Sequence, residues 1–243
     1  MIDLSIVIAA YNEETRLPAT LDRLLRFLAS SGLQWEIVLV DDGSRDNTLS
    51  LIQEYAARSP AIHVLTHTPN QGRGFAIRKG VLAAQGNLIL ETDADGSVAD
   101  EAITRFINYF NTYPEIDAIF GSRELPASYI ARKQPRLRVF LGLCFIYLAR
   151  ILFWAWHTTD FTLGFKMFRK KTAHDVFSHQ FSNHYVAEAE IVFVTKTRGW
   201  RAHELPVTWS DNRDSRVHPF RDSFRSLAGM MRILINALSG AYH

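Results

Sequence analysis

The sequence is poor in cysteine: Cys144 is the single one among 243 residues. No disulfide framework can form within the chain, which suits a reducing cytoplasmic environment. The first residues carry no basic segment and no cleavage pattern, so we expect no signal peptide. No Gly-x-x-x-x-Gly-Lys-Ser/Thr run occurs, which excludes a P-loop nucleotide site, and the nine histidines show no metal-binding spacing.

Charged residues of both signs are present, and the net charge is only +2, but the two signs are unevenly distributed. Residues 1–120 hold 9 Lys and Arg against 16 Asp and Glu, whereas residues 121–243 hold 18 against 9. A basic half of this kind points to nucleic acid, a membrane surface or anionic substrates, with solvated surface charge as the alternative. Hydrophobic residues make up 47% of the chain, enough for a substantial core.

The first half alternates between short apolar runs and amphipathic stretches. The runs expected as strands are 4–10, 36–40, 62–65, 88–90 and 116–120. Helices are expected after the first four of them, at about 17–28, 48–55, 70–84 and 100–113. This alternation predicts an α/β fold with a mainly parallel central sheet flanked by helices. No repeat and no Pro/Gly-rich linker occurs, so we expect one domain over residues 1–243.

The second half is less regular. We expect a basic loop at 129–138, a short strand at 165–168, a helix at 185–197 and a last strand at 203–209. Pro206 favours an edge position for that last strand, because proline donates no hydrogen bond to a neighbouring strand. Residues 224–238 repeat apolar side chains every three or four positions, which predicts a basic amphipathic helix.

The stretch from Asn87 to Asp100 carries the most chemistry. Its apolar run ends in Asp93-Ala94-Asp95 and Gly96, the pattern of a buried strand that enters a turn. Ligands of open α/β sheets collect at this carboxyl edge. Carboxylates two positions apart in a turn can face one Mg²⁺ or Mn²⁺ ion, so Asp93 and Asp95 are predicted metal ligands.

Polar clusters follow four of the predicted strands, at 11–13, 41–42, 93–95 and 121–123. As a set they are more informative than the lone Asp-x-Asp, because parallel strands bring their carboxyl ends to one edge. Arg123 offers a planar, permanently charged donor for a phosphate. Gly72-x-Gly74 lacks the third glycine of a dinucleotide fingerprint and lies far from the first strand, so a Rossmann dehydrogenase is set aside.

These motifs resemble the family 2 glycosyltransferases with the GT-A fold. The residues that carry the resemblance occur in order over roughly 4–216: Tyr11-Asn12-Glu13, Val40-Asp41-Asp42-Gly43-Ser44, Asn70-x-Gly72-x-Gly74, Asp93-Ala94-Asp95 and Gly121-Ser122-Arg123. Residues 160–168, DFTLGFKMF, are similar to a signature of the polyprenol-phosphate sugar transferases, which comprise dolichyl-phosphate mannose synthases and dolichyl-phosphate β-glucosyltransferases.

The resemblance implies a nucleotide-binding half at 1–123, an acceptor-binding half at 124–216 and a carboxyl-terminal amphipathic helix at 217–243. The residues implied at the nucleotide sugar are Ala9, Tyr11, Glu13, Val40, Asp42, Asp93, Ala94 and Lys166. The residues implied at the metal are Asp93, Asp95 and Ser97. The residues implied at the acceptor phosphate are Arg123, Arg213 and Arg216. Asp95, Arg123 and Glu190 are implied in catalysis, with Glu190 on a helix that faces the active site.

Three positions depart from the family pattern. Ala9 stands where the family has proline before Tyr-Asn-Glu, and Arg216 stands where it has lysine in its closing Ser-Lys. Ser97 stands where the mannose synthases carry glutamine, which contacts the metal there. Serine is a shorter and weaker ligand, so this position bears on metal affinity and donor choice.

The resemblance implies a metal-dependent enzyme that moves a hexose from a nucleotide sugar to a polyprenyl or dolichyl phosphate. UDP-glucose is the preferred donor and GDP-mannose the other candidate; no nucleic acid partner is expected. A lipid monophosphate arrives mostly ionised and needs no general base. We hypothesise inversion by direct displacement. An alcohol or saccharide acceptor would need a base, for which Glu190 and Asp160 are the candidates, and a catalytically idle nucleotide- and membrane-binding protein is the third possibility.

Residues 139–156 form the longest apolar stretch, interrupted by Arg150. It has 18 residues, whereas a bilayer core needs about 20. One interpretation is a buried core helix. We favour an interfacial helix, because Trp154, Trp156 and flanking arginines suit the headgroup boundary. With the 224–238 helix beside it, this predicts peripheral attachment to the cytoplasmic face of a membrane.

Overall fold

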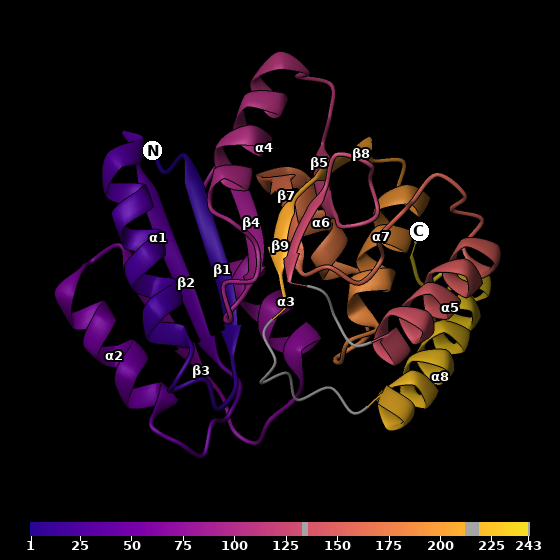
Figure 1. Cartoon of the computed structure of the whole chain (residues 1–243), viewed down its shortest axis with the longest axis horizontal. Helices are drawn as coiled ribbons and strands as arrows, with labels where there is room; N and C mark the ends of the chain where they lie inside the picture. Colours follow the sequence, from indigo (N-terminus) through magenta and orange to yellow (C-terminus); the bar gives the residue numbers. More distant parts are fainter. Residues whose placement is uncertain (133–135, 212–218, 243) are drawn as a thin grey trace.

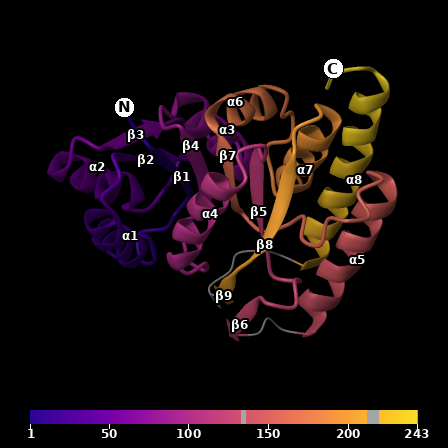
Figure 2. The ribbon, with the colours of Figure 1, turned by 90° about the horizontal axis from the view of Figure 1, so that it is seen from above.

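The computed structural model describes residues 1–132, 136–211 and 219–242. Its centre is a seven-stranded sheet in the order β3-β2-β1-β4-β7-β5-β8, with helices on both faces (Figures 1 and 2). The first four strands run parallel to one another; they are β1 (Leu4–Ala10), β2 (Trp35–Asp41), β3 (Ile62–Thr66) and β4 (Leu88–Asp93). The predicted α/β architecture is confirmed.

Alternation along the strands divides the apolar residues between two cores, one on each face of the sheet. In β1, Leu4, Ile6 and Ile8 face one core, whereas Val7 faces the other, because successive side chains of a strand point to opposite faces. Three helices contribute to the first core: α1 (Leu17–Ser31), α2 (Thr48–Arg58) and α4 (Glu101–Thr112). The second core is covered by α3 (Arg73–Ala83) and by helices of the second half.

The second half adds strands of both directions. The strand β7 (Phe165–Arg169) lies antiparallel to β4 and to β5 (Ala118–Ser122), and β8 (Ala202–Pro206) lies parallel to β5. The helix α6 (Lys170–Ser178) follows β7 directly and was not predicted from the sequence. The sheet is therefore mainly, but not wholly, parallel.

Two predicted elements differ from the structure. The stretch expected as an irregular basic loop contains β6 (Tyr129–Arg132) and, from Arg136, the start of a helix. The strand expected at 203–209 is divided into β8 and β9 (Thr208–Ser210), and β9 pairs with β6 in a separate two-stranded sheet. The division falls at Val207, which is buried and donates its N–H to the carbonyl of Ser122 at 3.3 Å.

Three further helices complete the second half: α5 (Arg136–Leu152), α7 (Ala187–Thr197) and α8 (Pro219–Leu238). Both views place α5 and α8 side by side at one end of the molecule (Figures 1 and 2). Both helices keep large apolar side chains exposed, and these include Phe140, Tyr147, Ile151, Met231, Ile235 and Leu238. Within the described ranges, every helix is too short or too polar to cross a membrane.

Candidate active site

Strand register brings the predicted nucleotide and metal residues to one edge of the sheet. Ala9, near the end of β1, pairs with Val40 of β2 on one side and with Asp93 of β4 on the other. Asp42 follows directly after β2, and Asp95 lies two residues after the end of β4. All four polar clusters expected from the sequence therefore share one sheet edge, because β5, which carries the 121–123 cluster, lies antiparallel to β7 just as β4 does and so ends at the same edge.

The turn after β4 holds the Asp-x-Asp pair. Gly96 takes a positive φ of 63°, which turns the chain back after Asp95. Oδ1 of Asp95 accepts hydrogen bonds from the backbone N–H of Ser97 at 3.0 Å and from its hydroxyl at 2.6 Å. Ser97, implied as a metal ligand, thus orients the Asp95 carboxylate in this structure, while the side chain of Asp93 is 39% exposed at the same edge.

Arg73, in the first turn of α3, is the direct partner of Asp93. Its Nε donates to Asp93 Oδ1 at 2.7 Å, and its Nη1 donates to Glu188 of α7. Burial by itself would lower the pKa of Arg73, but the charges of Asp93, Glu188 and Glu91 raise it well above its usual value. The guanidinium therefore remains charged beside the Asp-x-Asp turn.

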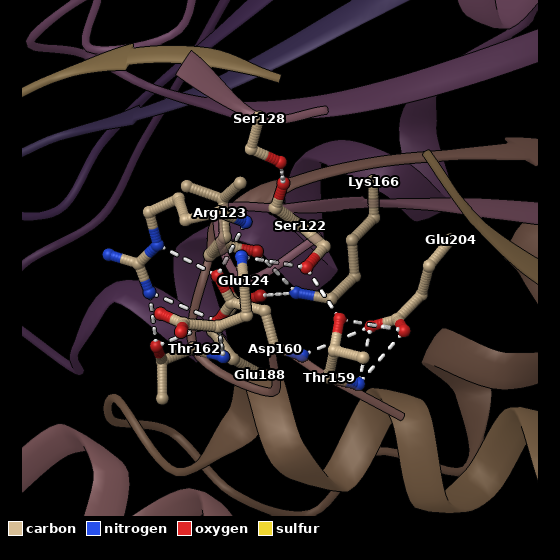
Figure 3. A network of polar contacts seen from close by, with 11 residues as sticks. Ser122, Arg123, Glu124, Ser128, Thr159, Asp160, Thr162, Lys166, Glu188 and Glu204 are labelled. Carbon is tan, nitrogen blue, oxygen red and sulfur yellow. Dashed lines mark hydrogen bonds and ion pairs between the residues drawn. The ribbon is translucent and has the colours of Figure 1, made fainter. Parts of the chain in front are cut away.

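A second cation lies behind the first. Lys166 of β7 is fully buried, and its Nζ donates to Glu188 and to the carbonyl of Leu163 at 2.6 Å (Figure 3). Glu91 of β4 pairs in register with Lys166, and its Oε1 lies 3.8 Å from Nζ. Burial and the charge of Glu188 raise the pKa of Glu91 to about 8, against the opposing effect of Lys166 and Arg73. We call Arg73, Lys166, Glu91 and Glu188 the buried charge cluster.

Gly164, in the signature-like segment 160–168, has no room for a side chain. A Cβ at this position would collide with Nη2 of Arg73 and lie 2.9 Å from Oδ1 of Asp93. Glycine lets the guanidinium cross directly over the backbone. The segment 160–168 therefore contributes to the site in two ways: Gly164 leaves room for Arg73 beside Asp93, and Lys166 supplies a buried cation.

Asp42, implied at the nucleotide sugar, is buried and makes several hydrogen bonds. Its carboxylate accepts hydrogen bonds from the side chain of Asn70 at 2.7 Å and from the N–H groups of Gln71 and Gly72 at 2.8 and 2.9 Å. The ring Nε2 of His67 lies 2.7 Å from it. In this structure Asp42 thus fixes the 67–72 loop, which leads into α3 and positions Arg73.

The Tyr-Asn-Glu segment after β1 makes a tight turn. Asn12 takes a φ of 55°, a left-handed conformation that asparagine tolerates better than most residues. Its side-chain oxygen accepts from the N–H of Arg45 at 2.7 Å. Glu13, which is 9% exposed, accepts from Nε of Arg16 at 2.7 Å and donates its N–H to Thr48 at 2.7 Å.

Two predicted nucleotide-sugar residues lie apart from these side-chain networks. Val40 is fully buried in the second core, where a Cβ on Gly80 of α3 would lie 2.9 Å from its Cγ2. Ala94 is buried in the first core. Any contact of these two residues with a ligand falls to the backbone, because their side chains point into the protein.

Arg123 lies at the end of β5 and is held by Asp160. Nε of Arg123 donates to Oδ2 at 2.7 Å and Nη2 to Oδ1 at 3.0 Å, and Nη2 also donates to the hydroxyl of Thr162 at 2.6 Å (Figure 3). Behind this pair, Glu204 of β8 accepts from the N–H groups of Thr159 and Asp160 at 2.8 and 3.0 Å. Asp160 therefore contacts Arg123 through its carboxylate and Glu204 through its N–H, which anchors the signature segment to β5 and β8.

Glu190 is placed on a different side of α7 from Glu188. Its carboxylate accepts from the N–H groups of Phe181 and Ser182, at 3.2 and 2.6 Å, and from the hydroxyl of Tyr242 at 2.5 Å. Residues two positions apart on a helix do not share a face. The structure thus turns Glu188 toward Arg73 and Lys166, and Glu190 toward the 181–182 segment and the end of the chain. Arg213 and Arg216, expected at the acceptor phosphate, lie outside the described residues.

A comparison with family models identifies the family of the chain. Residues 5–177 match the model described as glycosyl transferase family 2. The chain belongs to glycosyl transferase family 2. As a member of that family the protein is a glycosyltransferase, so the enzyme class expected from the motifs is confirmed.

Two relatives align with almost the whole of this glycosyltransferase. Dolichyl-phosphate beta-glucosyltransferase ALG5C of Trichomonas vaginalis is 31% identical over 248 residues, which cover 98% of this chain and 71% of that protein. The dolichyl-phosphate beta-glucosyltransferase of Homo sapiens is 28% identical over 253 residues, which cover 98% and 77%.

A solved structure confirms the GT-A fold of the glycosyltransferase. Glucosyl-3-phosphoglycerate synthase from Mycobacterium tuberculosis, crystallised with Mn²⁺ and UDP-glucose, superposes with a TM-score of 0.68. The match covers 95% of this chain and 78% of the synthase at 13% sequence identity. At that identity the likeness extends to the fold alone.

The oxygen ligands that the Asp-x-Asp turn of the glycosyltransferase offers fit a hard divalent cation. Asp93 and Asp95 offer carboxylate oxygens, which Mg²⁺ and Mn²⁺ prefer. Within 1–132, 136–211 and 219–242, no three His, Cys, Asp or Glu side chains are grouped to hold a metal. Two carboxylates still suit Mg²⁺, because proteins commonly bind it through one or two carboxylates together with substrate phosphates.

Sequence reasoning missed Arg73, Glu91 and Glu188 of this glycosyltransferase. Arg73 stands inside the Gly72-x-Gly74 motif, where it is visible as a cation at a helix start, but nothing local shows that it reaches Asp93. Glu188 and Glu190 were both visible, and helical periodicity requires that they face different ways. Which of the two faces the strand ends depends on how α7 packs on the sheet.

Proposed function

We propose that this glycosyltransferase moves glucose from UDP-glucose to a polyprenyl or dolichyl phosphate. The observation that carries the proposal is the meeting of the Asp93–Asp95 turn with Arg73 at the sheet edge, next to an Arg123 held by Asp160. The names of the relatives supply the acceptor and the sugar: both are dolichyl-phosphate beta-glucosyltransferases, similar along 98% of this chain.

The donor side rests on Asp93 and Asp95. Together they would hold Mg²⁺ or Mn²⁺, which neutralises charge that builds on a departing diphosphate. Ser97 keeps Asp95 oriented through two hydrogen bonds, and Arg73 keeps Asp93 oriented through one. These fixed groups need little rearrangement when the donor binds, which is the main contribution of electrostatic preorganisation.

On the acceptor side, a cationic side chain binds the phosphate, and no general base is needed. A lipid monophosphate has a second ionisation near pH 6, so at neutral pH its oxygen attacks as an anion. Arg123, anchored by Asp160, would receive that phosphate. The two carboxylates considered as bases are already engaged: Asp160 by Arg123 and Thr162, Glu190 by backbone N–H groups and Tyr242. This engagement supports a phosphate acceptor over an alcohol.

In the proposed reaction a phosphate oxygen of the lipid attacks the anomeric carbon of glucose. The bond from that carbon to the UDP oxygen breaks as the new bond forms, and UDP leaves with the electron pair. Direct displacement inverts the anomeric carbon, so an α-linked UDP-glucose gives a β-linked lipid product. The configuration is read from the anomeric coupling in the NMR spectrum of the product, and an α-linked product would contradict direct displacement.

A cavity beside α5 has a mixed lining of charged, polar and apolar residues. It has a volume of about 170 Å³ and is lined by Glu124, Leu143, Ile146, Tyr147, Arg150 and Thr159. Thr159 adjoins Asp160 and shares a 2.6 Å hydrogen bond with Ser122, so the cavity begins one residue from the Arg123 anchor. We propose that prenyl carbons next to the phosphate contact its apolar residues, Leu143, Ile146 and Tyr147.

We propose peripheral attachment to the cytoplasmic face of a membrane, and the exposed apolar surface of α5 and α8 supports the attachment itself. Trp154 and Trp156, just after α5, are 74% and 53% exposed, and Ile235 of α8 is 62% exposed. Exposed apolar patches of this kind mark interaction surfaces, and tryptophan favours the lipid–water boundary. An enzyme whose acceptor is a lipid must reach that boundary.

The test uses UDP-glucose and GDP-mannose as donors, with a short polyprenyl phosphate and the matching polyprenol as acceptors, at saturating Mn²⁺. The expected result is transfer of glucose to the phosphate and no transfer to the alcohol. Transfer from GDP-mannose would replace the donor, and transfer to polyprenol alone would replace the acceptor. Binding of UDP without transfer to either acceptor would contradict the proposed function as a whole.

A further inference from the structure

Glu188 joins three separate elements through one carboxylate. It lies in the first turn of α7 and is 3% exposed. Oε1 accepts from Nη1 of Arg73 in α3, and Oε2 accepts from Nζ of Lys166 in β7. Each oxygen therefore serves one cation, and both cations are held at the strand ends by the same side chain.

The Arg73 side of this bridge leads directly to the Asp-x-Asp turn. Nη1 of Arg73 is fixed by Glu188, and its Nε is fixed by Asp93 at 2.7 Å. The backbone of Gly164 lies against the same guanidinium. A planar guanidinium held at two of its nitrogens has one orientation, so Glu188 determines how Arg73 meets Asp93.

The charges of the buried cluster require this bridge. Arg73 and Lys166 are two cations, and Glu188 is the carboxylate that hydrogen-bonds both of them. Glu91 lies farther away, with oxygens 3.9 Å from Arg73 and 3.8 Å from Lys166. Loss of Glu188 would leave the buried charges of Arg73 and Lys166 without the carboxylate that they both contact. The two side chains would then move toward the carboxylates that remain. Asp93 is the nearest carboxylate for Arg73.

We propose that Glu188 is a positioning residue of the donor site: by bridging Arg73 and Lys166 it holds Arg73 against one oxygen of Asp93 and leaves the other oxygen for the metal–diphosphate. This inference rests on the proposed function, because it takes Asp93 as a ligand of the donor complex. Glu188 itself acts only through Arg73.

The test compares Glu188→Gln with a matched control elsewhere in the sheet. Glu36 of β2 is also 3% exposed and bridges two groups, Ser5 and the N–H of Gln85, at 2.6 and 2.5 Å. It lies near the start of β2, at the end opposite to Asp41. Glu36→Gln therefore removes a buried, bonded carboxylate of the same kind without touching the donor site.

Mn²⁺ is titrated into each protein in the presence of UDP, and donor kinetics follow. With Glu188→Gln we expect the Kd for Mn²⁺ and the KM for UDP-glucose to rise about tenfold, the usual effect of losing a group that orients a metal ligand. Both values should stay within about twofold of wild type for Glu36→Gln. Unchanged Mn²⁺ and donor affinity in Glu188→Gln, whatever its melting temperature, would overturn the proposal.

A double-mutant cycle with Arg73→Gln decides whether Glu188 acts through Arg73. We expect Glu188→Gln to add less than about twofold to the Mn²⁺ Kd once Arg73 is gone, because coupled residues are not additive. A further tenfold loss would overturn the positioning role. Failure of wild-type protein to bind UDP, with or without Mn²⁺, is a separate outcome: it would overturn the proposed function and this inference with it.

Discussion

The guanidinium of Arg123 and the carboxylate of Asp160 meet in a two-point ion pair, with distances of 2.7 and 3.0 Å. The pair connects the end of β5 to the segment that precedes β7, and Asp160 is fully buried. Burial by itself would raise the pKa of Asp160, but the charge and hydrogen bonds of Arg123 lower it to about 2. Asp160 is therefore ionised under all ordinary conditions and keeps Arg123 in one orientation.

We expect Asp160→Asn to destabilise the protein by about 3 to 5 kcal/mol, because it leaves Arg123 largely buried without its counter-charge. The KM for the lipid phosphate should rise more than the KM for UDP-glucose. Urea denaturation and steady-state kinetics measure the two effects. Glu54→Gln is the control: its pair with Arg58 is 3.7 Å long and about two-thirds exposed, so no more than about 1 kcal/mol is expected. Equal costs for the two variants would contradict the buried role.

The same pair predicts how stability depends on pH. Because the pKa of Asp160 is lower in the folded protein than in the unfolded chain, the unfolded chain takes up the proton first as the pH falls. The ionised Asp160 contributes about 2 kcal/mol to the free energy of unfolding. This contribution is complete above about pH 4 and is lost toward about pH 2. In urea denaturation, the difference in the free energy of unfolding between wild type and Asp160→Asn should therefore decrease as the pH falls from about 4 to about 2. A difference of constant size would count against the assignment.

Asp95→Ala is expected to abolish metal-dependent nucleotide binding, because it removes one of two carboxylates in the Asp-x-Asp turn. Calorimetric titration of UDP and GDP with Mn²⁺ measures the loss, which should reach at least about tenfold in Kd. Asp3→Ala is the control and should leave binding unchanged, since Asp3 accepts a hydrogen bond from the N–H of Gln34 at 2.9 Å next to the start of β1, far along the strand from Ala9. Retained Mn²⁺-dependent binding in Asp95→Ala would place the metal elsewhere.

Tyr242→Phe tests how the end of the chain is fastened to α7. The ring of Tyr242 is fully buried, and its hydroxyl donates to Glu190 at 2.5 Å. Burial, together with Glu190, raises the pKa of this hydroxyl, so it remains a donor. Removing it leaves a buried carboxylate short of one partner, at a cost of about 1 to 3 kcal/mol. Tyr147→Phe, on a residue that is 60% exposed, should be neutral in the same thermal melts.

Trp154→Ala tests the membrane surface. A large apolar side chain that enters the lipid boundary contributes about 1.5 to 3 kcal/mol, so the variant should bind anionic vesicles at least about tenfold more weakly. Co-sedimentation with vesicles of stated anionic content measures this. Leu82→Ala removes an apolar side chain that is 40% exposed on α3, outside the α5–α8 surface, and should leave binding unchanged. Equal binding by both variants would contradict attachment through α5 and α8.

The sequence by itself determined the strand–helix alternation of the first half and the family. The continuous run of branched apolar residues in β1 and the period-three or -four burial in α1 are local patterns, and Asp93 and Asp95 follow an apolar strand whatever the rest of the chain does. The parallel direction of β1, β2 and β4 follows from that alternation, whereas packing sets the strand order and the register that place Ala9 between Val40 and Asp93.

Only the tertiary structure decided which charges meet. Arg73 and Glu188 are 115 residues apart, and Glu91 and Lys166 become neighbours because β7 enters the sheet antiparallel to β4. The sequence shows two glutamates on α7 but not the rotation of that helix, which turns Glu188 to Arg73 and Lys166 and turns Glu190 to Tyr242. Long-range packing sets that rotation, and a buried charge takes its function from the partners that packing supplies.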